Sequence, residues 1–158
     1  MVNENRLWVK RVTLEGKIEH VSWVHVYEKI LNVTRSSFVI HEAVNWNPID
    51  RRWYFLPRRM SKDPWSKKTD SQGASTLVSC SEHFEDWIVK PLGIYQPMHG
   101  FSSFKFIPYR EHEIIALKTV ENGDEVHSDF EVIDIVKGKT LLHVRLGLIK
   151  FEGLEIIK

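Results

Sequence analysis

The sequence predicts an all-β fold with one short helical insertion, and three observations support this class. About twelve short segments are rich in β-branched and aromatic residues and are bounded by turn formers. Only one stretch has helical spacing, so the strands do not alternate with helices as in a doubly wound parallel sheet. Three apolar runs each contain an oxygen-bearing side chain, Glu42, Ser102 or Glu152, at separations of 60 and 50 residues. These separations are slightly above the ~40–50 residues of a four-stranded propeller blade, so twelve strands correspond to about three blades.

The first part of the chain predicts a hairpin followed by the helix. Residues 7–13 and 17–21 have strand-like composition, and Glu15-Gly16 between them supplies a tight turn. Ser22 is placed to cap the helix that follows. The apolar residues of this helix recur at three- and four-residue steps, and they are Trp23, Val26, Tyr27, Ile30 and Leu31. We expect the helix to pack this apolar stripe on the edges of the sheets.

The remaining strand signals are separated by turn formers. Residues 58–73 contain Pro64, several serines and several charges but little apolar periodicity, which predicts a long exposed loop. The strand at 101–107 begins with Gly100, Ser102 and Ser103, a pattern that suits either an ordinary turn and strand or a strand end aimed at a ligand. The predicted strands lie at residues 37–46, 52–57, 75–81, 87–90, 101–107, 113–119, 130–136, 141–145 and 149–157.

Composition restricts the class of protein without identifying a partner. The chain has 158 residues and 42% apolar content, which suits one globular domain with a core. Lys and Arg number 22 against 21 acidic residues, so no net charge favours nucleic acid or a membrane surface. Cys80 is single, which excludes an internal disulfide and a cysteine zinc cluster. No window approaches the ~20 apolar residues of a membrane span, and no signal-peptide pattern is present.

In a propeller, equivalent positions on the inner strands point at one central channel, so Glu42, Ser102 and Glu152 would converge there. Their carboxylate and hydroxyl oxygens suit a hard cation such as Ca²⁺, which takes about 6–8 oxygen ligands, so other oxygens must complete the shell. The alternative is that each glutamate faces solvent on a half-exposed strand. His41 and His99 lie next to these positions and either orient the ligands or serve as structural histidines.

Four motif runs resemble the soluble calcium-activated nucleotidases, and the resemblance extends to residues 2–5 and 8–10, essentially the whole chain. The runs are Met-His-Gly-Phe-Ser-Ser-Phe-Lys-Phe-Ile-Pro at 98–108, Arg-Trp-Tyr-Phe-Leu-Pro-Arg-Arg at 52–59, His41-Glu42 with Trp46, and Lys-Phe-Glu-Gly-Leu-Glu at 150–155. This resemblance implies an apyrase that folds as a five-bladed β-propeller. Residues 1–158 would be the C-terminal part of that single propeller domain, and the family's upstream serine and glutamate ligands have no counterpart here.

The same resemblance implies the chemistry and the site. Glu42, Ser102 and Glu152 match calcium ligands of the family. Arg58 follows the rigid Pro57, where a planar guanidinium can bind a phosphate with two N–H groups, although a solvated loop is the alternative. Lys105 alternates with two phenylalanines and reaches either substrate or an acidic neighbour. The general base is not identified by the sequence.

The expected function is calcium-dependent hydrolysis of nucleoside diphosphates, GDP and UDP and less well ADP, and of triphosphates, with this chain as an incomplete enzyme. The alternative is a non-catalytic partial propeller that acts as an interaction module, because an open arc exposes strand edges that favour self-association. The resemblance places the protein outside the cell or in the lumen of the endoplasmic reticulum or Golgi. No nucleic-acid partner is expected.

Overall fold

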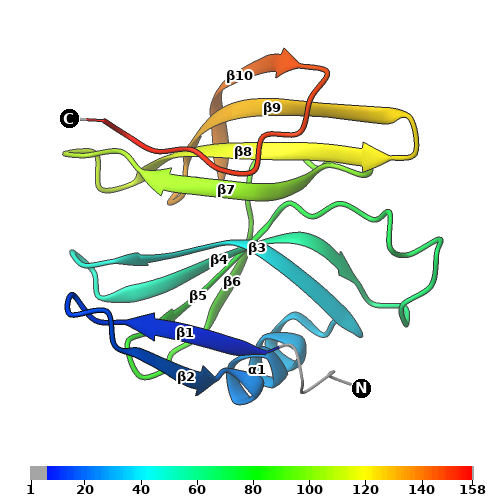
Figure 1. The fold of residues 1–158 in the computed structure, drawn as a ribbon. Coiled ribbons are helices and arrows are strands. Elements are labelled where there is room, and N and C mark those ends of the chain that lie inside the picture. The colour runs from blue at the N-terminus through cyan, green and yellow to red at the C-terminus, as the bar shows by residue number, and fades with distance from the viewer. Residues whose placement is uncertain (1–6, 158) are drawn as a thin grey trace.

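The computed structural model describes residues 7–157 and confirms the all-β class with one helical insertion (Figure 1). The motif segment at residues 2–5 lies outside the described residues. In chain order the elements are β1 (Trp8–Val12), β2 (Ile18–Ser22), α1 (Val24–Thr34), β3 (Phe38–Asn47), β4 (Arg52–Ser61), β5 (Thr76–Ser81), β6 (Ile88–Pro91), β7 (Gly100–Phe106), β8 (Glu113–Asn122), β9 (Glu125–Asp134) and β10 (Lys139–Gly147).

Two four-stranded antiparallel sheets and one hairpin make up the fold. One sheet has the order β3-β4-β5-β6, the other has the order β10-β9-β8-β7, and β1 pairs only with β2. Strands that are consecutive in the chain are neighbours in each sheet, and short turns connect most of them, whereas residues 62–75 form a long loop between β4 and β5. About three four-stranded units were expected, and the described residues form two such sheets together with the predicted two-stranded hairpin. No helix in the described part of the chain is long and apolar enough to cross a bilayer.

Three details of the predicted elements are wrong. Residues 7–157 contain ten strands, because residues 149–157 form no strand, and Ser128 holds this segment by side-chain hydrogen bonds to Ile149 and Phe151. The predicted loop at 58–73 starts later, since β4 continues through Pro57 to Ser61. Ser22 does not occupy the N-cap of α1, which is Trp23 and has no side-chain cap, although Ser22 Oγ lies 3.5 Å from the amide nitrogen of Val24.

The main apolar core lies between the two four-stranded sheets. It joins residues of the first sheet, such as Leu56 and Leu77, to Phe101 and Phe104 of β7, all at most 2% exposed. Truncating such a phenylalanine to alanine costs about 3–5 kcal/mol through lost burial and the cavity left behind. A second cluster joins Val26 and Ile30 of α1 to Phe55 of β4 and Val78 of β5, so the apolar stripe of the helix packs on the inner strands of one sheet, not on sheet edges as predicted. The two sheets are thereby fixed relative to one another.

The first strands of the two sheets, β3 and β7, lie side by side. Asn45 of β3 donates a 2.7 Å hydrogen bond from its side-chain amide to the carbonyl oxygen of Phe104 in β7. At the start of β7, a Cβ on Gly100 would lie 1.9 Å from the carbonyl oxygen of Arg58. Only glycine allows this approach, because any side chain would clash with backbone. The interruption at Gly100 therefore brings β7 against β4 next to Arg58.

Candidate functional site

Three of the predicted site residues lie where the sheet ladders lose register. The pairing of β3 with β4 skips Glu42 on one strand and Arg58 on the other, and the pairing of β7 with β8 skips Ser102. A residue skipped in this way at a β-bulge is released from the ladder, and its side chain is re-aimed. Pro57 has no N–H group to donate to the ladder, which explains the irregularity beside Arg58.

The guanidinium of Arg58 connects the two sheets. Its Nη1 donates to Glu42 Oε2 at 2.9 Å and to Thr119 Oγ1 at 2.6 Å, and its Nη2 donates to Glu121 Oε2 at 3.0 Å. Arg58 is only 5% exposed, so these charge-assisted bonds are partly shielded from water. Three of the five N–H groups of the guanidinium thus hold it in place, and it has the capacity to bind an anion with the others.

Lys150 extends this network to Glu152. Its Nζ lies 3.1 Å from Glu121 Oε2 and 3.0 Å from Glu152 Oε1. The hydrogen bond from Lys150 lowers the pKa of Glu121. Partial burial opposes the effect on Lys150, but its bonds to Glu152 and Glu121 raise the pKa of its ammonium group. Acidic and basic groups therefore alternate from Glu42 through Arg58, Glu121 and Lys150 to Glu152.

Ser102 lies against the backbone next to Glu152. Its hydroxyl is 3.2 Å from the carbonyl oxygen of Phe151, to which it donates a hydrogen bond. Ser128 of β9 holds the same segment, because its Oγ donates to the Ile149 carbonyl at 2.8 Å and accepts from the Phe151 amide at 2.9 Å. Two serines of the second sheet thus fix the tail that carries Lys150 and Glu152.

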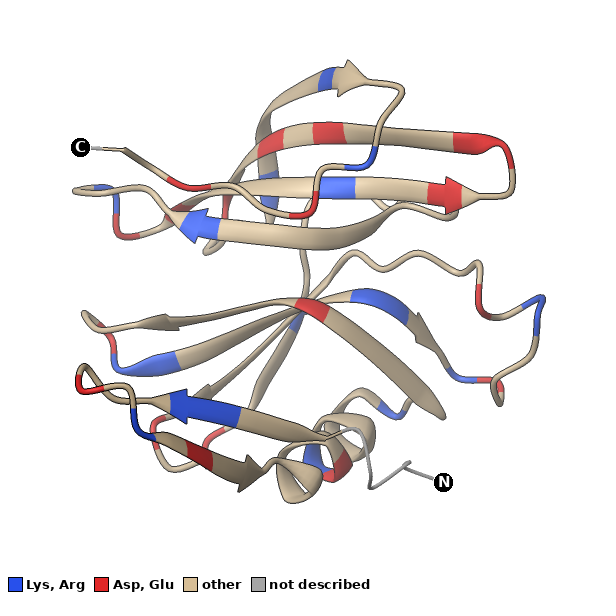
Figure 2. Cartoon of the chain, viewed as in Figure 1, with Lys and Arg blue, Asp and Glu red and all other residues tan. Residues whose placement is uncertain are grey.

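A polar pocket of 360 Å³ opens beside Arg58. Figure 2 shows acidic positions on β3 and at the end of β8 facing basic positions on β4. The pocket combines three cationic side chains with three carboxylates and small polar groups, and its lining is Ile40, Glu42, Arg58, Arg59, Lys67, Asp70, Ser71, Glu121 and Asn122. Such a balanced set can bind an anion and a cation together.

Other predicted residues lie apart from this network. Lys105 forms a 2.8 Å ion pair with Glu155, and neither residue belongs to the network around Arg58. His41 makes no hydrogen bond to Glu42 or to any other described residue, and its ring contacts Tyr27 and Phe55. The side chain is only partly buried, but both ring nitrogens are shielded from solvent, and this desolvation lowers the pKa of His41 to about 3. His41 is therefore a neutral structural residue, and it does not orient Glu42.

Sequence reasoning missed Thr119, Glu121 and Lys150. Thr119 and Glu121 are separated by one residue near the end of β8, so the period of two places both on one face of the strand. That signal is present in the sequence, but the partner of these residues, Arg58, is about 60 positions away. Lys150 lies within the motif run at 150–155, in which only Glu152 was predicted as a site residue.

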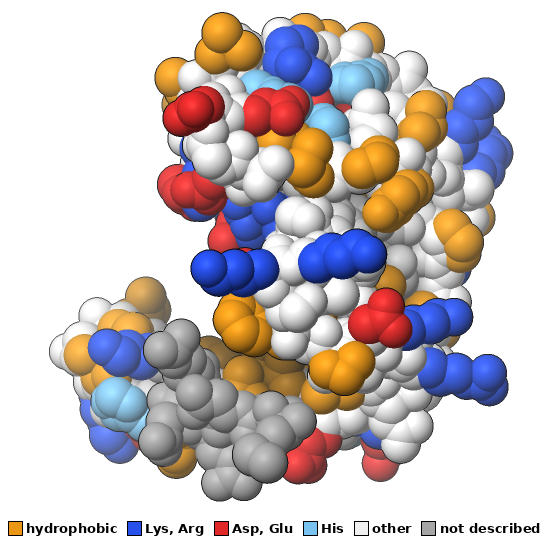
Figure 3. Space-filling model, turned by 90° about the vertical axis from the view of Figure 1, so that its right-hand side faces the viewer, with side chains coloured by type: hydrophobic (Ala, Val, Ile, Leu, Met, Phe, Trp, Pro, Cys, Tyr) orange, Lys and Arg blue, Asp and Glu red, His pale blue; other side chains and the backbone are white. Residues whose placement is uncertain are grey.

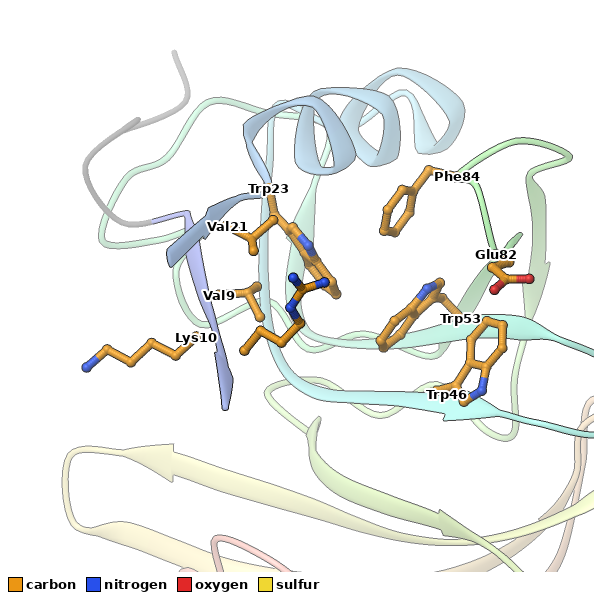
Figure 4. A pocket seen from close by; sticks show the side chains of 9 residues that line it. Val9, Lys10, Val21, Trp23, Trp46, Trp53, Glu82 and Phe84 are labelled. Carbon is orange, nitrogen blue, oxygen red and sulfur yellow. The ribbon is translucent and has the colours of Figure 1, made fainter. Parts of the chain in front are cut away.

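A second cavity has a different chemistry. It has a volume of 600 Å³ and lies between the β1-β2 hairpin and the first four-stranded sheet (Figure 4). Trp23, Trp46, Trp53 and Phe84 face it, and the rings of Trp23 and Trp53 meet edge to face at 5.3 Å. This lining is mostly apolar, and its charged members are Lys10, Arg11 and the single carboxylate Glu82. It therefore offers no group of carboxylates to hold a calcium ion.

Comparisons with known proteins converge on one family. A family model described as Apyrase matches residues 1–157. The chain is 37% identical over 163 residues to soluble calcium-activated nucleotidase 1 of Rattus norvegicus, an alignment that covers 99% of this chain and 40% of that protein. It is 36% identical over 162 residues to an apyrase of Cimex lectularius, with 98% of this chain and 44% of the relative covered. The chain thus spans less than half the length of these relatives.

Proposed function

Because this chain belongs to the apyrase family, we propose that it forms part of an enzyme that hydrolyses nucleoside di- and triphosphates with calcium and releases phosphate. The preferred substrates are GDP and UDP, with ADP hydrolysed less well. The observation that carries this proposal is the position of Arg58 between Glu42 and Glu121 at the edge of a 360 Å³ polar pocket. A relative's name, soluble calcium-activated nucleotidase 1, supports the role of calcium.

The residues around Arg58 fit a calcium ion in their chemistry. Glu42 and Glu152 offer carboxylate oxygens, Ser102 a hydroxyl oxygen and Phe151 a carbonyl oxygen, which are the hard ligands that Ca²⁺ prefers. Arg58 and Lys150 now balance the two carboxylates. We propose that Glu42, Ser102 and Glu152 hold the ion, with water oxygens among the remaining ligands. When bound, calcium neutralises phosphate oxygens and positions them.

Arg58 is the proposed phosphate contact within this chain. Its guanidinium is fixed by three hydrogen bonds, so little conformational entropy is lost when it binds an anion. Lys105 is the second proposed contact. Its ion pair with Glu155 is exposed, because the Glu155 side chain is 69% accessible, and such a pair exchanges readily for a phosphate.

We also propose the architecture and location that the resemblance implies. Residues 1–158 are the C-terminal part of one five-bladed propeller domain, and the two four-stranded sheets are two of its blades. The neighbouring positions of β3 and β7, joined through Asn45 and Phe104, support inner strands that face one channel. The proposed location is secreted or in the lumen of the endoplasmic reticulum or Golgi.

The test is phosphate release from GDP, UDP and ADP with calcium and then with a chelator. It is made on the 158-residue chain and on a chimaera in which this chain replaces the aligned 163 residues of the rat relative. We expect calcium-dependent release by the chimaera, fastest with GDP and UDP. A folded chimaera without activity, while the rat protein is active under the same conditions, would overturn the proposal.

A matched pair of variants identifies the ion's ligand. Glu42→Gln keeps the size of the side chain and removes its charge. We therefore expect half-maximal phosphate release to need at least ~10-fold more calcium, with a matching loss of release at the parent's calcium concentration. Glu28→Gln, on the exposed face of α1, is the control and should behave like the parent. Equal calcium dependence in both variants would remove Glu42 from the ligand set.

A second candidate, an interaction module, rests on β10. This outermost strand exposes Leu141, Leu142, Val144 and Leu146 to between 44% and 50%. An exposed apolar edge strand favours pairing with a second chain. Sedimentation of the 158-residue chain distinguishes the cases, because a dimer that dissociates in the Leu142→Lys variant supports the module and a monomer opposes it.

A further inference from the structure

A second group of metal-ligating side chains lies on the second sheet and has no part in the network around Arg58. It consists of His99, directly before β7, and of His127 and Asp129 on β9, and their ligand atoms lie within 4.8 Å of one another. Figure 3 shows histidine side chains among charged groups on the surface formed by this sheet. His127 is 4% exposed and Asp129 is fully buried, so this is not a solvated surface cluster.

The spacing of the three ligand atoms matches one face of a metal coordination tetrahedron. His99 Nε2 lies 3.1 Å from His127 Nε2 and 3.2 Å from Asp129 Oδ2, and the third edge, from His127 Nε2 to Asp129 Oδ2, is 3.9 Å. Bonds of 2.0–2.1 Å to a tetrahedral Zn²⁺ require edges of about 3.3 Å. An ion fits among these atoms with small movements of the side chains.

The hydrogen bonds of His99 orient its ring as a metal ligand. Its Nδ1 lies 2.9 Å from the carbonyl oxygen of Pro97, which can only accept, so Nδ1 carries the proton and Nε2 presents its lone pair. The carbonyl oxygen of His99 in turn accepts from the Ala74 amide at 3.0 Å. His127 directs its own Nε2 at His99 and its Nδ1 toward Glu125. The two Nε2 atoms face each other at 3.1 Å, a distance that an N–H···N hydrogen bond from His127 satisfies and that a metal ion between them would replace.

One oxygen of the Asp129 carboxylate is free to bind a metal ion. Its Oδ1 accepts a hydrogen bond from Arg145 Nε on β10, whereas its Oδ2 is buried and has no hydrogen-bond partner among residues 7–157. A buried, unpartnered carboxylate oxygen costs free energy, and a metal ion removes that cost. His143 Nε2 lies 3.6 Å from Oδ1 and is 37% exposed, so it or a water is available as a fourth ligand.

This cluster is separate from the proposed calcium ligands. His127 and Asp129 flank Ser128 in β9, and side chains alternate between the two faces of a strand. Ser128 binds the tail at Ile149 and Phe151, the segment that also meets Ser102. The histidine cluster therefore lies on the opposite face of the sheet from that tail. Its nitrogen donors also favour a different kind of ion, because imidazole suits zinc and related transition metals and oxygen suits calcium.

We propose that His99, His127 and Asp129 form a binding site for one first-row transition-metal ion of the Zn²⁺ class, distinct from the calcium site. The ion ties the start of β7 to β9 and adds stability to the second sheet. This site does not depend on the proposed hydrolytic function, because binding of metal is its readout.

The experiment is a titration of the metal-free 158-residue chain with Zn²⁺, followed by calorimetry and by competition with a chromophoric chelator, in millimolar Ca²⁺. We expect one Zn²⁺ per chain, not displaced by calcium, and a visible tetrahedral spectrum when Co²⁺ replaces zinc. His99→Gln and His127→Gln should each weaken Zn²⁺ binding by at least ~100-fold. His83→Gln, an exposed histidine elsewhere, is the matched control and should bind like the parent.

Thermal unfolding keeps the test valid if a variant is less stable. The parent and His83→Gln should unfold at higher temperature with Zn²⁺ than without it, because an ion that binds only the folded chain stabilises it. The two site variants should fold and show no such shift. Absence of Zn²⁺ binding by the parent, or binding that survives both site substitutions, would overturn the proposal.

Discussion

Glu42 and Arg58 are the two residues that the β3-β4 ladder skips, and they are hydrogen-bonded to each other at 2.9 Å. Each is released from its strand by a register shift, and the two irregularities are adjacent because Pro57 cannot donate to the ladder. The same irregular backbone places Arg58 against Gly100 and Thr119 of the second sheet. One local defect in pairing thus creates the contact between the sheets around which the candidate site is built.

Arg58→Lys should reduce both stability and activity. Lysine carries the charge but cannot reach Glu42, Thr119 and Glu121 together, so we expect a loss of about 2–3 kcal/mol in the free energy of unfolding. In the chimaera described above, the Michaelis constant for GDP should rise about 10-fold. The control is Arg51→Lys, whose pair with Glu82 is exposed and should contribute less than about 1 kcal/mol. Equal effects of the two substitutions in urea unfolding would contradict the buried network.

Ser128→Ala tests whether the tail positions Glu152. The variant loses the two hydrogen bonds to Ile149 and Phe151, so the free energy of unfolding should fall by about 1–2 kcal/mol. Hydrogen exchange of the Phe151 amide should accelerate, and calcium should bind about 10-fold more weakly.

A serine with the same pattern of bonds provides the control. Ser81 donates to the Glu85 carbonyl and accepts from the Glu85 amide at 3.0 and 3.1 Å, away from the site. Ser81→Ala should cost similar stability and leave calcium binding unchanged. If calcium binds equally to both variants, the tail does not position a ligand.

The shielded ring of His41 makes stability depend on pH. Burial lowers its pKa from 6.5 to about 3 in the folded chain, so the unfolded chain binds a proton more readily between these values. The stabilisation is therefore complete above pH 6.5 and is lost as pH falls toward 3. Between pH 7 and pH 5 this residue should remove about 2 kcal/mol of stability.

His41→Phe should abolish that contribution. Urea unfolding at pH 7 and at pH 5 measures the difference, and the variant should lose about 2 kcal/mol less than the parent on acidification. His83→Gln, at an exposed position, should keep the pH dependence of the parent. A pH dependence in His41→Phe identical to that of the parent would mean that the ring is accessible to protons in the folded chain.

Lys118 and Glu131 form a buried pair in the second sheet. Lys118 Nζ lies 3.5 Å from Glu131 Oε1 and 4.8 Å from the ring centre of Phe101, and both charged side chains are at most 2% exposed. Lys118→Met leaves the carboxylate buried without its partner, so it should cost about 3–5 kcal/mol. Adding Glu131→Leu should restore much of this loss. Additive effects in urea unfolding would show that the two charges do not interact.

The sequence by itself determined the all-β class of fold and the position of the helix. Alternating apolar residues and turn formers are local signals, so β3, β7 and β8 were predictable, and the helical spacing located α1. Gly100 also signalled a close backbone approach, which proved to be to Arg58. Glu42, Ser102 and Glu152 stood out because oxygen groups interrupt apolar runs, and their role as calcium ligands stays a prediction.

Only the tertiary structure decided which charges meet. Side chains alternate with a period of two, so a shift of one residue in register moves a group to the other face of its sheet. The skipped residues Glu42, Arg58 and Ser102 lie at such shifts, and no local sequence pattern predicts where a ladder skips a residue. His99 and His127 are 28 residues apart, yet sheet pairing brings their ring nitrogens to 3.1 Å. Register and long-range packing, and not local propensity, therefore brought together the side chains of both clusters.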